Sequence, residues 1–394
     1  IDAPIHEVMV NDPITVNTKD DNSKISELLI SGINQLPVLD DDRRVVDVEF
    51  RVEKIKTETF PILRGKAPLR ISFAGGGTDL PYFFEQNGGV VINATINQYC
   101  HATIVKRADS KILINSDLCD DLFFDVRNIE CDGKFNLVKA VTNILKPDFG
   151  FELYLRNDVP PGRGLGSSAT LAVLIAKLIS NLQSHEYDDY KLADIAYTAE
   201  RDELKIKGGW QDQYAAVTGG FNFMEFDADK RIIYPLRLKE DTISELNERL
   251  LLCYVGSSHY SSDVHENQEK SFIAKKEDMV PKLIELKKIA IDIKDSLLVG
   301  ELDKIGDLLH KSWENKKRLD SVISNIEIDR LYNIGLKNGA YGGKLLGAGA
   351  GGYLLFMHSP YKRNQLSRVL ESEGGSILNF NFEKKGVKVW QVRD

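Results

Sequence analysis

Apolar residues recur with the spacing of helices and strands along most of the chain. Four segments have the apolar spacing of helices, the last two of them long and amphipathic: residues 168–182, 191–204, 279–298 and 302–318. Three apolar runs predict strands: residues 90–105, 250–255 and 352–357. Helices and strands interspersed in this way predict an α+β fold.

The first 50 residues have a shorter pattern of their own. Its predicted order is strand, helix, strand, strand, at residues 14–16, 23–33, 35–39 and 45–48. Residues 51–61 are charged and mixed in character and end at Pro61, which predicts a linker. We therefore expect a small α/β appendage over residues 1–50, joined by residues 51–61 to a larger body.

Charge is distributed unevenly between these two parts. Residues 1–50 contain eleven acidic and four basic side chains, so this block carries −7 of the net charge of −8 of the whole chain. An acidic block beside a nearly neutral body offers no binding surface for nucleic acid or anionic lipid. No stretch approaches the roughly 20 apolar residues that span a membrane. We therefore expect no nucleic-acid partner and no membrane partner.

Composition indicates a globular protein with reduced thiols. The chain has 394 residues, 42% of them apolar and 28% charged, which is typical of two or three globular domains. The four cysteines are scattered, without a Cys-x-x-Cys pair or a His at the spacing of a zinc site: Cys100, Cys119, Cys131 and Cys253. This pattern argues against a disulfide framework or a thiolate metal site. Because no signal-peptide pattern is visible either, we expect a cytoplasmic location.

The densest cluster of glycines and hydroxyl residues is PPGRGLGSSA at residues 160–169, directly before a predicted helix. A glycine-rich turn that leads into a helix exposes unpaired N–H groups and lets the main chain approach a phosphate. An ordinary capped helix after a flexible loop is the alternative. The stretch is not a Walker A loop, because Gly-Lys-Ser/Thr is absent. Its candidate nucleotide-binding residues are Pro161, Gly162, Gly164, Leu165, Gly166, Ser167, Ser168 and Ala169.

Two further glycine-rich stretches lie on either side of this one. The first is KAPLRISFAGGGTDL at residues 66–80, and the last is GGKLLGAGAGG at residues 342–352. In this order the three stretches resemble the three motifs of the GHMP kinases. The resemblance covers residues 62–394 and implies a two-domain kinase fold, with an N-terminal domain over residues 62–240 and a C-terminal domain over residues 241–394.

The resemblance also implies roles for individual residues, with ATP and Mg²⁺ as cofactors. Asp212, in the segment GWQDQ, is similar to the residue that faces the attacking hydroxyl, and Arg70 matches a position of the family's first motif. These two residues are the catalytic candidates. Ser168 and Glu200 would share Mg²⁺, which prefers a few hard oxygen ligands. The sugar-binding candidates are Gly76, Gly77, Thr78 and Asp79, and the third motif adds Gly347 and Gly349 beside the nucleotide loop.

The segment APLRISFAGGGTDLPYFFEQNGGVVINATI is similar to D-glycero-D-manno-heptose 7-phosphate kinases and to L-fucokinase domains. This implies phosphorylation of C1 of a heptose 7-phosphate, giving a 1,7-bisphosphate for nucleotide-heptose and surface polysaccharide synthesis. A kinase of a free sugar such as L-fucose and a non-catalytic nucleotide-binding regulator are the alternatives. A phosphorylated sugar needs a basic contact, for which the candidates are His101, Lys106, Lys316, Lys317 and Arg318.

The N-terminal block resembles a CBS module over VMVNDPITVNTKDDNSKISELLISGINQLPVLDDDRRVVDV. The pattern departs from that family after Val48, where a charged linker stands in place of a second helix. An incomplete, acidic module of this kind favours a docking or self-associating element over a nucleotide sensor.

Overall fold

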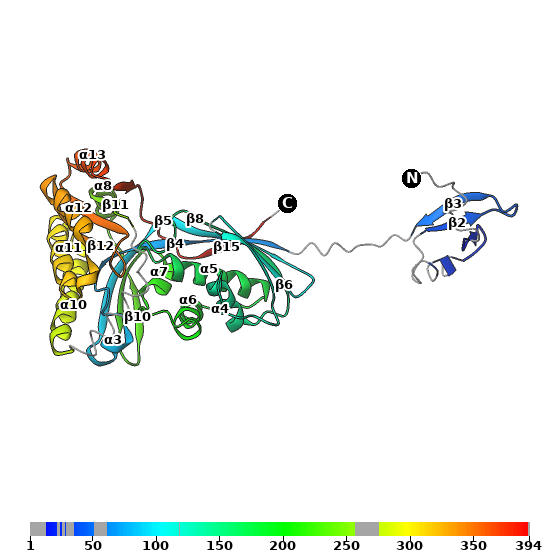
Figure 1. The fold of residues 1–394 in the computed structure, drawn as a ribbon, viewed down its shortest axis with the longest axis horizontal. Helices are drawn as coiled ribbons and strands as arrows, with labels where there is room; N and C mark the ends of the chain where they lie inside the picture. The colour runs from blue at the N-terminus through cyan, green and yellow to red at the C-terminus, as the bar shows by residue number, and fades with distance from the viewer. Residues whose placement is uncertain are drawn as a thin grey trace. The chain divides into compact units, whose positions relative to one another are not determined.

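The structure is a computed structural model of the chain, shown in Figure 1. It describes residues 13–21, 24–25, 28, 35–50, 61–117, 119–256 and 276–392. The chain divides into two compact units, Ile1–Phe60 and Pro61–Asp394. Each unit has a core of its own, so we describe them separately.

The first unit is built on a three-stranded sheet of β1 (Val16–Asn17), β2 (Gln35–Leu39) and β3 (Val45–Phe50). β1 pairs with β2 in parallel, and β2 pairs with β3 antiparallel. The strands predicted at residues 35–39 and from residue 45 are confirmed. Most of the predicted helix 23–33 and residues 51–60 of the predicted linker lie outside the described residues. The core consists of Val16, Leu36 and Val38, with Ile25 and Leu28 packed against it.

The second unit contains an eight-stranded sheet with helices on one face (Figure 1). Its strands are β4 (Ile62–Ala74), β5 (Gly89–Lys106), β6 (Lys111–Ser116), β7 (Cys119–Asp125), β8 (Phe151–Asn157), β9 (Phe221–Phe226), β10 (Arg231–Pro235) and β15 (Lys388–Gln391). The helices along it are α4 (Asn136–Leu145), α5 (Ser167–Leu182), α6 (Asp189–Thr198) and α7 (Gln211–Thr218), and α3 (Pro81–Asn87) follows β4. α5 packs against β4 and β5 through a face that is almost entirely buried.

A four-stranded sheet with the order β12-β13-β11-β14 forms the other part of this unit. Its strands are β11 (Leu250–Tyr254), β12 (Ala340–Leu345), β13 (Tyr353–His358) and β14 (Ser376–Leu378). The helices around it are α8 (Glu240–Arg249), α10 (Lys276–Val299), α11 (Leu302–Lys317), α12 (Ile326–Lys337) and α13 (Arg363–Ser372), with a 3₁₀ turn η2 (Ser321–Ile323). Trp313, Tyr332 and Phe356 are among the largest side chains of its core. The expected mixed α+β architecture is therefore confirmed.

Two predicted elements differ in detail from what the sequence suggested. The run at residues 90–105 is one 18-residue strand, β5, because its first half pairs with β9 and its second half with β8. The helix predicted at residues 191–204 ends at Thr198 and continues as a π turn η1 (Ala199–Glu203). π turns are rare and concentrate at functional sites, and this one directs the side chain of Glu200 into the protein.

The last strand of the chain returns to the first strand of the second unit. β15 pairs antiparallel with β4, with Lys388 opposite Lys66 and Gln391 opposite Leu63. Residues from the predicted C-terminal domain thus complete the sheet of the predicted N-terminal domain. The division at residue 240 stays a prediction, since residues 61–394 form a single compact unit.

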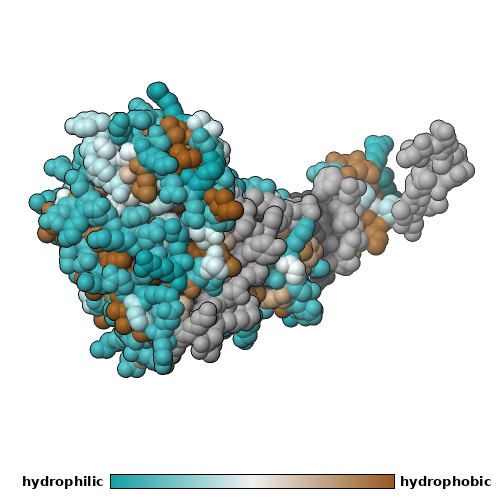
Figure 2. Space-filling model, turned by 60° about the vertical axis from the view of Figure 1, so that its left-hand side comes forward, coloured by the Kyte–Doolittle hydropathy of each residue, from teal (hydrophilic) through white to brown (hydrophobic). Residues whose placement is uncertain are grey.

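None of the helices in the described part of the chain is both long and apolar enough to cross a membrane. The face turned forward in Figure 2 is mostly hydrophilic, with apolar residues scattered over it.

Candidate active site

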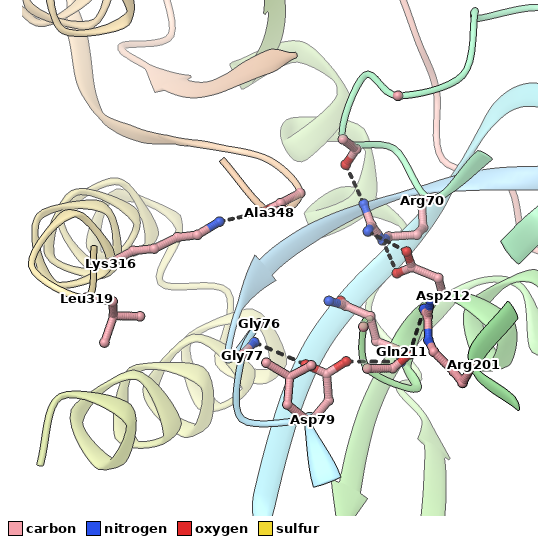
Figure 3. Close-up of a pocket in the computed structure, with 17 residues that line it drawn as sticks. Arg70, Gly76, Gly77, Asp79, Arg201, Gln211, Asp212, Lys316, Leu319 and Ala348 are labelled. Atoms are coloured by element: carbon pink, nitrogen blue, oxygen red, sulfur yellow. Dashed lines mark hydrogen bonds and ion pairs between the residues drawn. The ribbon is translucent and has the colours of Figure 1, made fainter. Parts of the chain in front are cut away.

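The three glycine-rich stretches meet around one cavity of about 190 Å³ (Figure 3). Lys316 and Leu319 lie on one side of it, and Arg70, Asp212, Gln211 and Arg201 lie on the other, in the view of Figure 3. The predicted site residues that line it are Arg70, Gly76, Gly77, Asp79, Gly162, Gly164, Gly166, Asp212 and Gly347. The cavity is therefore walled by segments that lie far apart in the sequence.

The second and third stretches touch through their main chains. Gly164 and Gly347 both have positive φ, of 82° and 77°. A Cβ atom on Gly164 would lie 2.5 Å from the Leu346 carbonyl oxygen, and one on Gly347 would lie 2.5 Å from Gly164 Cα. Because both neighbours are backbone atoms that cannot move aside cheaply, only glycine fits at either position. Gly349 does not line the cavity and packs instead against Ile323 of η2.

Helix α5 begins directly after the second stretch. Gly166, at φ 78°, precedes the first helical residue, Ser167. The N–H groups of a first helical turn have no partners within the helix and are suited to bind an anion. Leu165 is buried, and its carbonyl accepts a hydrogen bond from the Arg70 N–H (3.1 Å), which ties this loop to β4. The predicted residues of this stretch that do not line the cavity are Pro161, Leu165, Ser167, Ser168 and Ala169.

Arg70 and Asp212 form a two-point ion pair at the cavity wall. Arg70 Nε donates to Asp212 Oδ1 at 2.7 Å, and its Nη2 donates to Oδ2 at 2.9 Å. The remaining terminal nitrogen, Nη1, donates to the Gly164 carbonyl at 2.6 Å. The Arg70 side chain is 4% exposed and that of Asp212 is 23% exposed. Asp212 is therefore fixed in orientation while it stays open to the cavity.

Asp79 is a buried carboxylate held by two main-chain N–H groups. Its Oδ1 accepts from Gly77 at 3.0 Å, and its Oδ2 accepts from Gln211 at 3.2 Å. Burial, together with the nearby Asp212 charge, raises the pKa of Asp79. A Cβ atom at Gly209 would lie 1.9 Å from Asp79 Oδ2, so the Gly209 main chain covers this carboxylate.

Thr78 lies behind the cavity rather than in it. Its hydroxyl is fully buried and donates to the Gly75 and Val90 carbonyls, at 2.7 and 2.8 Å, as alternatives. The same hydroxyl accepts from the Val90 N–H at 3.0 Å. These contacts fix the glycine turn between β4 and α3. Its neighbours Gly76 and Gly77 line the cavity, whereas the Thr78 side chain does not.

Ser168 and Glu200 lie together beside the start of α5. Ser168 Oγ donates to Glu200 Oε1 at 2.7 Å, and Gln213 Nε2 donates to Oε2 at 2.7 Å. Burial raises the pKa of Glu200, whose side chain is 2% exposed. No group of three His, Cys, Asp or Glu residues suited to a metal occurs in the described residues. Mg²⁺ usually takes one or two protein oxygens and completes its shell with phosphates and water, so this pair fits Mg²⁺ beside a polyphosphate.

Two buried lysines lie at or near the site, and Lys316 lines the cavity. Lys316 Nζ donates to the Gly347 carbonyl. Burial and the nearby Arg70 charge lower the pKa of Lys316 to about 8, against an opposing effect of Asp79. Lys344 Nζ donates to the Phe73 carbonyl at 3.2 Å. Burial, followed by Lys316 and Arg70, lowers the pKa of Lys344 well below its ordinary value.

The five basic residues predicted as possible contacts for a substrate phosphate differ in their position relative to the cavity. Only Lys316 of this group lines the cavity. His101 lies 3.1 Å from Asp158 and lines a separate cavity, and Lys106 lies over the Phe149 ring at 4.3 Å. Lys317 pairs with Glu314 at 2.7 Å. Arg201 and Gln211 also line the site, although no role was predicted for either. The signal in the sequence was their position next to Glu200 and Asp212.

Comparison with known proteins shows which family has the same sequence pattern. The family model "GHMP kinases N terminal domain" matches residues 136–220, and "GHMP kinases C terminal" matches residues 293–376. A D-glycero-alpha-D-manno-heptose 7-phosphate kinase of Campylobacter jejuni is 38% identical over 84% of this chain and 99% of its own length. The bifunctional fucokinase/GDP-fucose pyrophosphorylase of Arabidopsis thaliana is 26% identical over 77% of this chain and 30% of its own length.

A solved structure has the same fold as the second unit. The crystal structure of a D-glycero-D-manno-heptose 1-phosphate kinase from Bacteroides thetaiotaomicron superimposes with a TM-score of 0.71 and 31% sequence identity. The match covers 84% of this chain and all of the other.

Proposed function

The chain belongs to the GHMP kinases and is an ATP-dependent sugar kinase, and we propose that its substrate is D-glycero-D-manno-heptose 7-phosphate. The products would be the 1,7-bisphosphate and ADP. The observation that carries this proposal is the Arg70–Asp212 pair in a cavity walled by all three glycine-rich stretches. The 38% identity to the Campylobacter jejuni heptose 7-phosphate kinase supports the choice of sugar.

The second and third stretches hold the phosphates of ATP. Gly162, Gly164 and Gly166 bring the main chain close to the phosphates, and the first turn of α5 supplies N–H groups to their oxygens. Gly347 contributes from the opposite side through its contact with Gly164. The other predicted residues of these stretches support the loop's shape: Pro161, Leu165, Ser167, Ala169 and Gly349.

Asp212 accepts the proton of the C1 hydroxyl while the hydroxyl oxygen bonds to the γ-phosphorus. The bond from that phosphorus to the β–γ bridging oxygen breaks, and ADP leaves. Arg70 keeps the carboxylate aimed at the hydroxyl through its two hydrogen bonds. Because the transition state of phosphoryl transfer is loose, orientation of the hydroxyl matters more than the basicity of the carboxylate.

Asp79 binds hydroxyls of the sugar ring. Each of its oxygens already accepts one main-chain N–H, which leaves capacity for one further hydrogen bond on each. Gly76 and Gly77 leave room for the ring beside it. Thr78 acts indirectly by holding their turn in place.

Ser168 and Glu200 would hold Mg²⁺ next to the phosphates. When bound, Mg²⁺ screens the phosphate charge and stabilises the leaving group. The two oxygens lie at the start of α5, where the phosphate loop ends, and this position supports the assignment.

Replacing Glu200 by Gln should raise the Mg²⁺ concentration needed for half-maximal activity by about 10–100-fold. Gln keeps the shape of the side chain but removes the charge that binds the cation. Activity would be titrated against Mg²⁺ at fixed ATP. Glu203→Gln is the matched control, because Glu203 is an exposed acid in the same π turn. An unchanged Mg²⁺ requirement in Glu200→Gln would remove Glu200 from the metal site.

The substrate is tested by measuring ADP release with ATP and Mg²⁺ across a panel of acceptors. The panel contains D-glycero-D-manno-heptose 7-phosphate, the unphosphorylated heptose, D-mannose, L-fucose, D-galactose and mevalonate. We expect the highest kcat/KM for the heptose 7-phosphate. Turnover of L-fucose alone would favour the second candidate, a free-sugar kinase, which the Arabidopsis fucokinase relative keeps in view. Nucleotide binding without turnover of any acceptor would favour a regulator.

The N-terminal unit has a separate proposed role. We propose that it is an incomplete CBS-like module that serves in docking or self-association. Its parallel β1–β2 pair, antiparallel β2–β3 pair and acidic sequence support this assignment. We also propose that the enzyme acts in the cytoplasm, as its scattered cysteines suggest.

A further inference from the structure

We propose that Arg201 and Lys207 form a phosphate-binding subsite that holds the phosphate already present on the sugar substrate. This inference rests on the proposed function. It gives a binding site to the sugar phosphate, which none of the residues described above contacts.

The subsite is a second cavity that adjoins the first. Its volume is about 240 Å³. Leu80, Arg201 and Gly208 line both cavities, so the two share a wall. The other residues that line the second cavity are Pro81, Tyr82, Tyr197, Asp202, Ile206 and Lys207. The two cavities are therefore adjacent, and we assign the sugar ring to the first and its phosphate to the second.

Arg201 has donors to spare and is held rigidly. Of its five N–H donors, the main chain uses two: Nη1 donates to Ile206 at 3.1 Å and Nη2 donates to Gly209 at 3.4 Å. Each of these nitrogens keeps a second N–H group. Arg201 Nη2 also forms an ion pair with Glu200 Oε2 at 3.8 Å, a distance at which no hydrogen bond uses up a donor. The Arg201 side chain is 14% exposed, so its charge is little screened by water.

Packing around Arg201 fixes the plane of the guanidinium group. A Cβ atom at Gly208 would lie 2.4 Å from Arg201 Nη2, so the guanidinium lies directly against this main chain. On another side it lies 5.7 Å from the Tyr197 ring, which stacks on Trp210 with ring centres 3.4 Å apart. A planar, fixed guanidinium suits two-point binding of a phosphate.

The charges that line the second cavity favour an anion. Arg201 and Lys207 contribute two positive charges, and the exposed Asp202 contributes one negative charge. Burial raises the pKa of Tyr197 to about 12, so its hydroxyl stays protonated and can donate to a phosphate oxygen. The residues lining this cavity thus carry a net positive charge and neutral donors.

The proposed contacts of the sugar ring and of its phosphate are covered by two consecutive residues of the chain. The Gly209 main chain covers Asp79, the proposed contact of the ring hydroxyls, whereas Gly208 covers Arg201. Lys316 is less suited to this phosphate. It is bound to Gly347, next to the proposed ATP loop, and lies on the side of the pocket opposite Arg201 (Figure 3).

The test compares kcat/KM for D-glycero-D-manno-heptose 7-phosphate with kcat/KM for the unphosphorylated heptose. We expect Arg201→Gln to lower this ratio about 10–100-fold, the effect of losing charge-assisted hydrogen bonds. Arg201→Lys should restore part of the ratio, and Lys207→Gln should lower it less than Arg201→Gln does. Lys205→Gln is the matched control. Lys205 is exposed, precedes Lys207 by two residues and lines neither cavity.

A purely structural role for Arg201 would reduce turnover of both sugars together and leave the ratio unchanged, which would overturn the subsite. Lys207 is exposed, so its variant tests the same point without disturbing the core. If the wild-type enzyme prefers the phosphorylated heptose and neither variant alters that preference, the subsite is wrong and the proposed function stands. If the wild-type enzyme shows no such preference, the proposed substrate is wrong and the subsite falls with it.

Discussion

Asp212→Asn is expected to lower kcat by about 10²–10⁴-fold, the usual contribution of a positioned acid–base group. Asn has nearly the same shape as Asp, but it cannot accept the proton of the sugar hydroxyl. It also places an amide NH₂ group against one of the two Arg70 donors that now bind Asp212 at 2.7 and 2.9 Å. Turnover would be measured with saturating sugar and ATP, and nucleotide affinity would be measured separately by fluorescence.

The control for this variant is Asp194→Asn. Asp194 also pairs with an arginine, Arg231, at 3.4 Å, but it does not line the active-site cavity. The control variant therefore measures the loss of folding stability when an Asp–Arg pair outside the active site is removed. Near-wild-type turnover by Asp212→Asn would exclude Asp212 as the group that receives the proton. A loss of ATP affinity as large as the loss of kcat would point instead to a collapsed loop.

Lys316→Met is expected to lower kcat by about 10²–10³-fold, as removal of one preorganised electrostatic contact to a transition state does. Lys316 reaches the Gly347 carbonyl, and Gly347 lies against Gly164, so the lysine ammonium group lies beside the proposed ATP loop. Met keeps the length and apolar part of the side chain and removes only the charge. Lys317→Met is the matched control, since Lys317 follows directly on α11 and pairs with Glu314 outside the cavity.

The pH dependence separates a charge role of Lys316 from a packing role. Its pKa is lowered to about 8 by burial and by Arg70, with Asp79 acting in the opposite direction and Lys344 also close by. The lysine is charged below this pH and neutral above it, so kcat/KM should fall as pH rises through about 8. Lys316→Arg stays charged over this range and should lose that alkaline decline. The same decline in both enzymes would assign it to another group.

The glycine-rich walls of the site could be predicted from the sequence because glycine leaves a specific signal. Gly164 and Gly347 have positive φ and no room for a Cβ atom, and such demands concentrate glycine at fixed positions. The pair of Ser168 and Glu200 was also anticipated, and the structure brings the two side chains within 2.7 Å. The roles of these residues remain proposals.

Cationic residues were harder to assign because a lysine or arginine on a helix usually faces solvent. Lys316 and Lys317 are adjacent in sequence, yet the first is 8% exposed and the second pairs with Glu314 on the outside. Only the packing of α11 against β12 decides which of the two faces inward. Arg201 was missed for a related reason: η1 is a π turn, and the 3.6-residue period used to assign a helical face does not hold across it.

Strand β4 is synthesised near the start of the kinase unit, whereas its edge partner β15 follows about 310 residues later in the chain. At about 5–20 residues per second, this edge of the sheet waits on the order of tens of seconds for its partner. An unpaired strand edge can pair with other chains, so the nascent enzyme exposes this edge to aggregation until β15 has been made. A message truncated just before β15 would therefore encode every proposed catalytic residue and still release a kinase with an open sheet edge.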